Sequence, residues 1–204
     1  MAKKTKKSSP SQTYMKGNFT TPKCEAIWPS LGEINETSQK FEISTLIEDT
    51  KEWNDLLASL LEFQNECLER DGNKPQDTLL CVKDVVAFNE EDEAWEPNGE
   101  SRLIFKSLSA DKFSVVGPDR QPIEPDLVSG GSTGGDTVRV NGTAAFGYFG
   151  KAPYVTLYLK AVQRISGGGA SGVAAFDDET GEAGEDAPFE DEGSVDHGAV
   201  GDLA

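Results

Sequence analysis

Three consecutive segments near the end of the chain decide the fold: TVRVNGTAAFGYF at 137–149, GKAP at 150–153 and YVTLYLKAVQR at 154–164. In the last segment, apolar side chains occupy alternate positions, at Val155, Leu157 and Leu159. This period of two is typical of a strand that is buried on one face. Because a short turn-forming link separates the two apolar segments, we predict a hairpin of two long strands.

Shorter strands are predicted in the preceding part of the chain. Pro29 and Gly32 interrupt the first predicted strand, at 26–29. The acidic segment 89–99 (NEEDEAWEPNG) is predicted to be a loop between the strands at 79–88 and 101–107. The glycine-rich segment 129–136 (SGGSTGGD) also reads as a loop. The predicted strands lie at 26–29, 41–46, 79–88, 101–107 and 112–116.

One amphipathic helix is predicted at about 50–70, with Asp49 or Thr50 as its N-cap. Its apolar positions follow helical spacing: Trp53, Leu56, Leu57, Leu60, Leu61, Phe63, Cys67 and Leu68. A single helix with this apolar face needs a sheet to cover. We therefore predict an all-β-dominated fold, a β-barrel with one covering α-helix, of the OB-fold-like Greek-key type.

Composition divides the chain into four parts. Residues 1–18 lack apolar periodicity and are predicted to be a disordered basic arm. Residues 19–165 form the predicted domain, and 166–173 form a Gly-rich linker. Residues 174–204 are acidic and rich in Ala and Gly, which predicts a disordered acidic tail.

Charge is distributed very unevenly around the net value of −17. Residues 1–23 carry six Lys and no acid, whereas 166–204 carry eleven acids and no Lys or Arg. Between them, 24–101 hold 5 basic and 20 acidic residues, and 102–165 hold 8 basic and 5 acidic. Since Lys and Arg neutralise phosphates, only the segment 102–165 is a plausible surface for a polyanion.

Catalysis and cofactor binding are not expected. The one histidine, His197, lies in the predicted tail, so it cannot join a Ser or Cys in the domain. The cysteines Cys24, Cys67 and Cys81 lack zinc-site spacing and are predicted to be reduced thiols of a cytoplasmic protein. Acidic clusters usually lie in solvated loops, but a magnesium site built from them stays open. We expect no signal peptide and no membrane span.

The segment 138–154 has the composition of a surface for single-stranded nucleic acid. Phe146, Tyr148 and Phe149 lie between Arg139 and Lys151, and such binding needs aromatic faces for bases beside cations for phosphates. Phe146 and Tyr148 share one face of a strand, so we predict that both stack on bases. Phe149 points the other way, and whether Phe146 or Phe149 is the buried ring stays open. The alternative is that the face of Phe146 and Tyr148 is the core.

Further phosphate contacts are predicted from the remaining cations of the basic segment, namely Lys106, Lys112 and Lys160.

The chain resembles the single-stranded-DNA-binding proteins encoded by tailed bacteriophages. The resemblance lies in the MAKK start, FEISTLI at 41–47, EWNDLLASLLEFQNECL at 52–68, and the closing block with its glycine linker and acidic tail. It implies an OB-fold with a packed helix. It also implies that the DNA-binding aromatics near the closing hairpin are Phe146, Tyr148 and Phe149, with Arg139 and Lys151 beside them. It also implies a tail that docks a replication polymerase or a helicase/primase. The tail departs from the family pattern because it ends in Leu203-Ala204, with its aromatics inboard.

We therefore expect a non-enzymatic protein that coats single-stranded DNA during phage replication and recombination, in the cytoplasm of the infected host cell. Its tail is expected to compete with DNA for the binding surface. A homodimer stays open. The alternatives are an acidic interaction or scaffolding protein whose tail is the functional element, and a metal-dependent nuclease or phosphatase.

Overall fold

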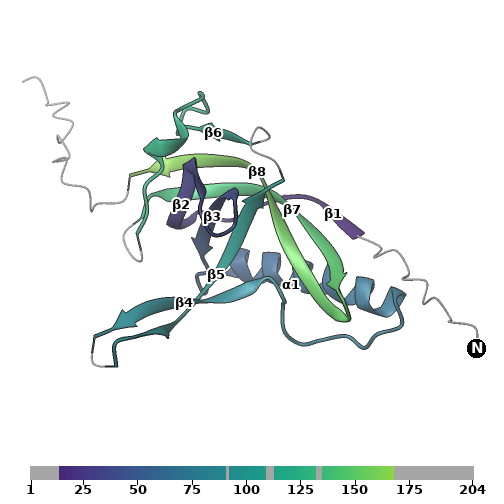
Figure 1. The fold of residues 1–204 in the computed structure, drawn as a ribbon. Coiled ribbons are helices and arrows are strands. Elements are labelled where there is room, and N and C mark those ends of the chain that lie inside the picture. The colour runs from purple at the N-terminus through teal and green to yellow at the C-terminus, as the bar shows by residue number, and fades with distance from the viewer. Residues whose placement is uncertain (1–13, 91, 109–112, 132–134, 168–204) are drawn as a thin grey trace, which may run out of the picture. The chain divides into compact units, whose positions relative to one another are not determined.

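The computed structural model describes residues 14–90, 92–108, 113–131 and 135–167. The predicted tail, most of the predicted linker and residues 1–13 of the predicted arm lie outside the described residues. The elements are shown in Figure 1. In chain order they are β1 Tyr14–Thr20, β2 Cys24–Asn35, β3 Lys40–Leu46, α1 Lys51–Arg70, β4 Val82–Asn89, β5 Ala94–Ser107, β6 Ser114–Val116, η1 Pro125–Leu127 (a 3-10 helix), β7 Thr137–Phe149 and β8 Ala152–Ser166.

Five of the strands close into a ring in the order β7, β2, β3, β5, β8 and back to β7. Four of the five contacts are antiparallel, and the contact between β5 and β8 is parallel. The other strands extend this ring: β1 pairs with β7, β6 with β8 and β4 with β5. A closed five-stranded ring with one helix is an OB-fold-like barrel, which confirms the predicted fold class.

The core fills the ring and continues under the helix. Side chains from β3, β5, β7 and β8 meet there, and α1 contributes Trp53, Leu60, Phe63, Cys67 and Leu68 to the same cluster. Trp53 is completely buried. The predicted helix is thus confirmed, and its apolar face is part of the barrel core.

Side-chain hydrogen bonds fix the start of α1 and the segment that follows it. Thr50 is the N-cap, and its hydroxyl accepts from the backbone N–H of Trp53. Further along, the buried amide of Gln64 donates to the Thr78 carbonyl and accepts from the Leu80 N–H, which holds the segment after the helix against it.

Among the described residues, no helix is long and apolar enough to cross a membrane.

Three of the predicted boundaries are wrong. β1 begins at Tyr14, inside the range predicted as a disordered arm, because β7 offers it an open edge to pair with. β2 continues through Pro29 and Gly32, with register shifts that accommodate them. Most of the acidic segment 89–99 is strand, since β4 and β5 pair up to Asn89 and Ala94.

A buried ion pair anchors the glycine-rich loop to the last strand. The Asp136 carboxylate is buried and lies 2.7 Å from the Arg164 Nε atom. It also accepts hydrogen bonds from the backbone N–H and the hydroxyl of Ser129. Gly135 passes against the Ala26 carbonyl of β2, where a Cβ atom would clash, so this position requires glycine.

We expect Asp136→Ala to destabilise the protein by about 2–3 kcal/mol. The substitution leaves the Arg164 guanidinium and the Ser129 N–H without this partner, and the loss is less than for a fully buried pair because Arg164 is partly exposed. The matched control is Asp55→Ala, which breaks the exposed pair with Lys51 and should cost less than about 0.5 kcal/mol. Urea unfolding followed by tryptophan fluorescence measures both, and equal costs would contradict the anchoring role.

Candidate nucleic-acid interface

The two faces of β7 are distinguished by strand alternation and by burial near the two ends of the strand. Val138, Val140, Ala144 and Phe146 all point into the barrel and are fully buried. Phe149 is on the other face and is 86% exposed. The predicted exposure of Phe146 to bases is therefore wrong, and the alternative that this face is the core is confirmed for Phe146. A ring inside the core offers no surface to a base.

Tyr148 points to the same side as Phe146 and is half-buried. Its ring packs edge-on against Phe146, with 5.3 Å between the ring centroids. Its hydroxyl accepts a hydrogen bond from the Asn73 amide, and burial, together with the nearby Asp71 carboxylate, raises the pKa of Tyr148. Tyr148 therefore ties the end of β7 to the segment after α1, and it shares a face with Phe146 as predicted, while its stacking on bases stays a prediction.

Three aromatic side chains lie on the outer face of the β7–β8 hairpin. Phe149 pairs with Ala152, Gly147 with Tyr154, and Thr143 with Tyr158, so these six residues share one face. Tyr154 is 39% exposed, and Tyr158 is half-buried. Phe149, Tyr154 and Tyr158 form what we call the aromatic row.

Gly147 sets the position of one ring in this row. A Cβ atom at Gly147 would lie 2.9 Å from the Tyr154 hydroxyl oxygen and 3.1 Å from the ring carbon that bears it. The Tyr154 ring therefore lies over the bare backbone of β7 and presents its other side to solvent. A larger residue at 147 would push the ring off the sheet.

Cations stand at both ends of the aromatic row. Lys151 is exposed in the turn beside Phe149, where it lines a cleft of about 310 Å³ with Lys74 and Tyr148. At the other end, Lys106 on β5 pairs in register with Tyr158, and Lys160 follows on the same strand.

Beyond Lys106, the outer face continues onto β3 and β2. The Lys106 ammonium lies 3.3 Å from the Glu42 carboxylate, in a partly exposed ion pair. The Arg102 guanidinium stacks on the Trp28 ring at 4.6 Å and donates to the Ser44 hydroxyl. Burial lowers the pKa of Arg102, and the Glu42 charge opposes this shift.

Two of the predicted cations are not part of this surface as described. Arg139 is exposed but lies ten positions before Phe149 on β7, where it lines a cleft with Lys23, Glu48 and Glu52. Those two carboxylates offset its charge. Lys112 lies outside the described residues.

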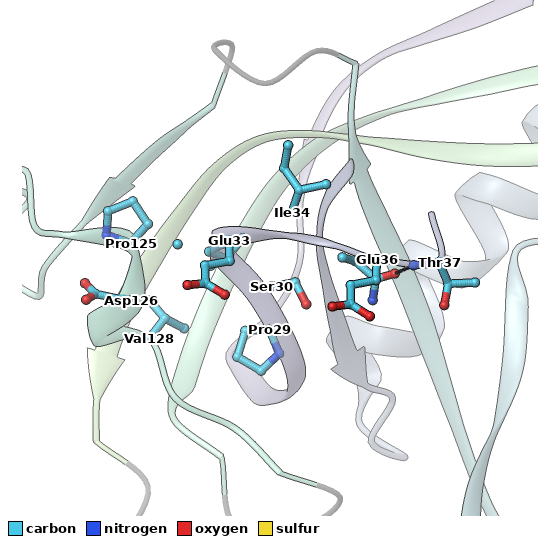
Figure 2. A pocket seen from close by; sticks show the side chains of 12 residues that line it. Pro29, Ser30, Glu33, Ile34, Glu36, Thr37, Pro125, Asp126 and Val128 are labelled. Atoms are coloured by element: carbon cyan, nitrogen blue, oxygen red, sulfur yellow. Dashed lines mark hydrogen bonds between the residues drawn. The ribbon is translucent and has the colours of Figure 1, made fainter. Parts of the chain in front are cut away.

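A cleft of about 580 Å³ lies between β2 and η1 (Figure 2). Its charged lining residues are Glu33, Glu36 and Asp126, and none of its lining residues is basic. Three carboxylates around one opening repel phosphate groups. This cleft is therefore a poor site for nucleic acid.

The described residues contain no cluster of three or more His, Cys, Asp or Glu side chains suited to a metal ion. The three cysteines are buried free thiols. Burial raises the pKa of both Cys24 and Cys81 to about 12, so these thiols stay protonated and are poor nucleophiles.

Sequence reasoning missed Tyr154 and Tyr158, although the pattern contained the signal. Both tyrosines alternate with Val155, Leu157 and Leu159, which mark the buried side of β8. On β7, counting from the buried Val138 and Val140 assigns Phe146 to the core side and Phe149 to the outer side. The glycines around Phe146 suggested an exposed surface, and that cue was misleading.

The barrel and its outer face define an OB-fold protein with an exposed aromatic row between cations. No protein-family model and no curated protein sequence matches the chain. Solved structures do match it, and among them are single-stranded-DNA-binding proteins of bacteriophages. The sequence resemblance is thus confirmed at the level of the fold.

One match is the C-terminally truncated single-stranded DNA-binding protein of bacteriophage Enc34, with a TM-score of 0.54 and 16% identity over 74% of this chain and 86% of that one. The same phage protein in complex with single-stranded DNA matches with a TM-score of 0.54 and 14% identity over the same shares. Gp2.5, a single-stranded DNA-binding protein encoded by bacteriophage T7, matches with a TM-score of 0.54 and 15% identity over 84% of this chain and 99% of that one.

We expect opposite results from removing the two phenylalanines of β7. Phe146→Ala should cost about 3–5 kcal/mol of stability because it leaves a cavity in the core. Phe149→Ala should cost less than about 0.5 kcal/mol, since its ring is in solvent. Denaturant unfolding measures both values. A reversed order would show that the two faces of β7 are assigned the wrong way round.

Proposed function

We propose that this chain is a non-enzymatic protein that binds single-stranded DNA without sequence preference during phage DNA replication and recombination. The observation that carries the proposal is the aromatic row Phe149, Tyr154 and Tyr158 with cations at both ends. The fold supports it, because solved phage single-stranded DNA-binding proteins share this fold.

Bases stack on the aromatic row. Tyr154 and Tyr158 are four positions apart on one strand, which separates them by about 13 Å along β8. The two rings therefore contact different nucleotides. Stacking is tolerant of sequence because every base has an aromatic face, and each stack contributes about 1–3 kcal/mol. A row of rings without a base-reading helix suits a protein that must coat any sequence.

Phosphates are held by the flanking lysines. Lys151 binds the backbone at the turn, while Lys106 and Lys160 bind it beyond Tyr158. The Lys106–Glu42 pair is no obstacle, because a partly exposed ion pair contributes at most about 1 kcal/mol and a phosphate can replace the carboxylate. Arg139 and Lys112 extend the contact to longer strands.

The acidic tail, residues 174–204, competes with DNA for this face and docks the replication polymerase or helicase/primase once DNA displaces it. The charge contrast supports this: eleven acids and no Lys or Arg follow residue 165, while 102–165 carry a net +3. A Gly-rich linker keeps the tail at roughly millimolar effective concentration near the lysines.

We expect Phe149→Ala, Tyr154→Ala and Tyr158→Ala each to weaken binding of oligo-dT by about 1–3 kcal/mol, the contribution of one stacked base. Fluorescence titration measures the affinity, and thermal unfolding checks that each variant is folded. The matched control is Ile34→Ala, which removes an exposed apolar side chain in the acidic cleft between β2 and η1 and should leave affinity unchanged. Three folded variants with unchanged affinity would remove the basis of the proposal.

We expect deletion of residues 174–204 to strengthen oligo-dT binding, most at low salt, where attraction between the tail and the lysines is least screened. It should also abolish association with the replication polymerase in a pull-down experiment. The control replaces the tail acids with Asn and Gln at the same length, and this variant should behave like the deletion. Unchanged affinity at low salt would mean that the tail does not compete.

A further inference from the structure

The β4–β5 hairpin projects from the barrel as an acidic arm (Figure 1). Its described residues, 82–90 and 92–101, carry six carboxylates and one lysine, and with Glu91 the whole segment has a net charge of −6. No described Lys or Arg forms an ion pair with these carboxylates, since the three ion pairs of the described part lie elsewhere. The six acids are Asp84, Glu90, Asp92, Glu93, Glu96 and Glu100.

Two aromatic rings are exposed among these acids. Phe88 and Trp95 pair across the hairpin, with 5.6 Å between ring centroids and an edge-on geometry. Phe88 is 50% exposed and Trp95 is 64% exposed. An indole face next to carboxylates attracts an ammonium group by two interactions, a cation–π contact with the ring and Coulomb attraction to the carboxylates. The same acids repel DNA, so this surface fits a basic protein segment.

We propose that the β4–β5 hairpin binds the lysine-rich residues 1–13 of a second copy of this chain. That segment contains Lys3, Lys4, Lys6 and Lys7 and no acid, for a net charge of +4. Its charge is therefore opposite in sign to that of the hairpin. Lysine ammonium groups stack on Trp95 and Phe88 and pair with Glu93, Glu96 and Glu100.

The arrangement of the fold makes this contact intermolecular. The hairpin projects on the opposite side of the barrel from the first residues of β1 (Figure 1). A folded unit of about 150 residues has a radius of gyration of about 15 Å, so a path around half of it is about 60 Å. Lys3 lies eleven residues before Tyr14 and reaches at most about 40 Å from it. A neighbouring copy is therefore the partner within reach.

Copies joined in this way form an open head-to-tail series, because the basic segment and the hairpin are two different surfaces. Adjacent copies on one DNA strand are then held to each other as well as to DNA. Since the contact is electrostatic, it weakens as salt rises. The contact itself does not require DNA, so it is tested without it and independently of DNA binding.

The first test titrates a synthetic peptide of residues 1–13 into the full-length protein at low ionic strength. The peptide has no aromatic residue, so a change in tryptophan fluorescence comes from the protein, and Trp95 is its most exposed tryptophan. We expect a saturable change that Trp95→Phe removes. Glu96→Lys with Glu100→Lys should weaken binding at least tenfold. The matched control, Glu62→Lys with Glu69→Lys on exposed positions of α1, changes net charge equally and should bind as the unaltered protein does.

The second test mixes isotopically labelled and unlabelled full-length protein and joins contacting Lys and carboxylate side chains with a carbodiimide. Mass spectrometry should find links between Lys3–Lys7 of one copy and Glu93, Glu96 or Glu100 of another. Links confined to single copies, or to the acids of residues 174–204, would overturn the proposal. So would peptide binding that the hairpin and α1 charge reversals weaken equally, or no binding at low salt.

Discussion

The position of β8 between β7 and β5 is the constraint on which the rest of the structure depends. Its antiparallel pairing with β7 and parallel pairing with β5 close the ring, so Leu157 and Leu159 must face inward. A slip of one residue would exchange all inward and outward side chains of the strand, and burial of one face excludes it. Tyr154, Tyr158 and Lys106 are thereby held on the outer face together.

Close backbone approach around this hairpin depends on two glycines. A Cβ atom at Gly142 would lie 2.8 Å from the Phe105 ring, so glycine at this position lets that ring pack inside the barrel. Gly147 does the same on the outer face for the Tyr154 ring. Glycine weakens a strand. At both positions a side chain would collide with a neighbouring ring, which explains why this long strand contains glycine there. One glycine serves the core and the other serves the proposed DNA surface.

Separation of charge resolves the conflict between a net charge of −17 and a polyanionic ligand. The outer face around the aromatic row carries lysines, whereas the acids gather on the β4–β5 hairpin and in the cleft at Glu33, Glu36 and Asp126. Charges farther apart than about 10 Å are largely screened at ordinary salt, so the acidic surfaces do not cancel the local attraction of the lysines for DNA. They are free to serve protein contacts instead.

Sequence by itself determined the class of fold, the helix with Trp53 in the core and the long closing hairpin, because these follow from periodicity within one segment. It also contained the correct assignment of the two faces of β7, because Val138 and Val140 mark the core side. The glycines around Phe146 obscured that assignment. Only the tertiary structure decided which strands are neighbours and which side chains they bring together. The meeting of Lys106 with Tyr158 depends on strand pairing between segments far apart in the chain, which no local pattern records.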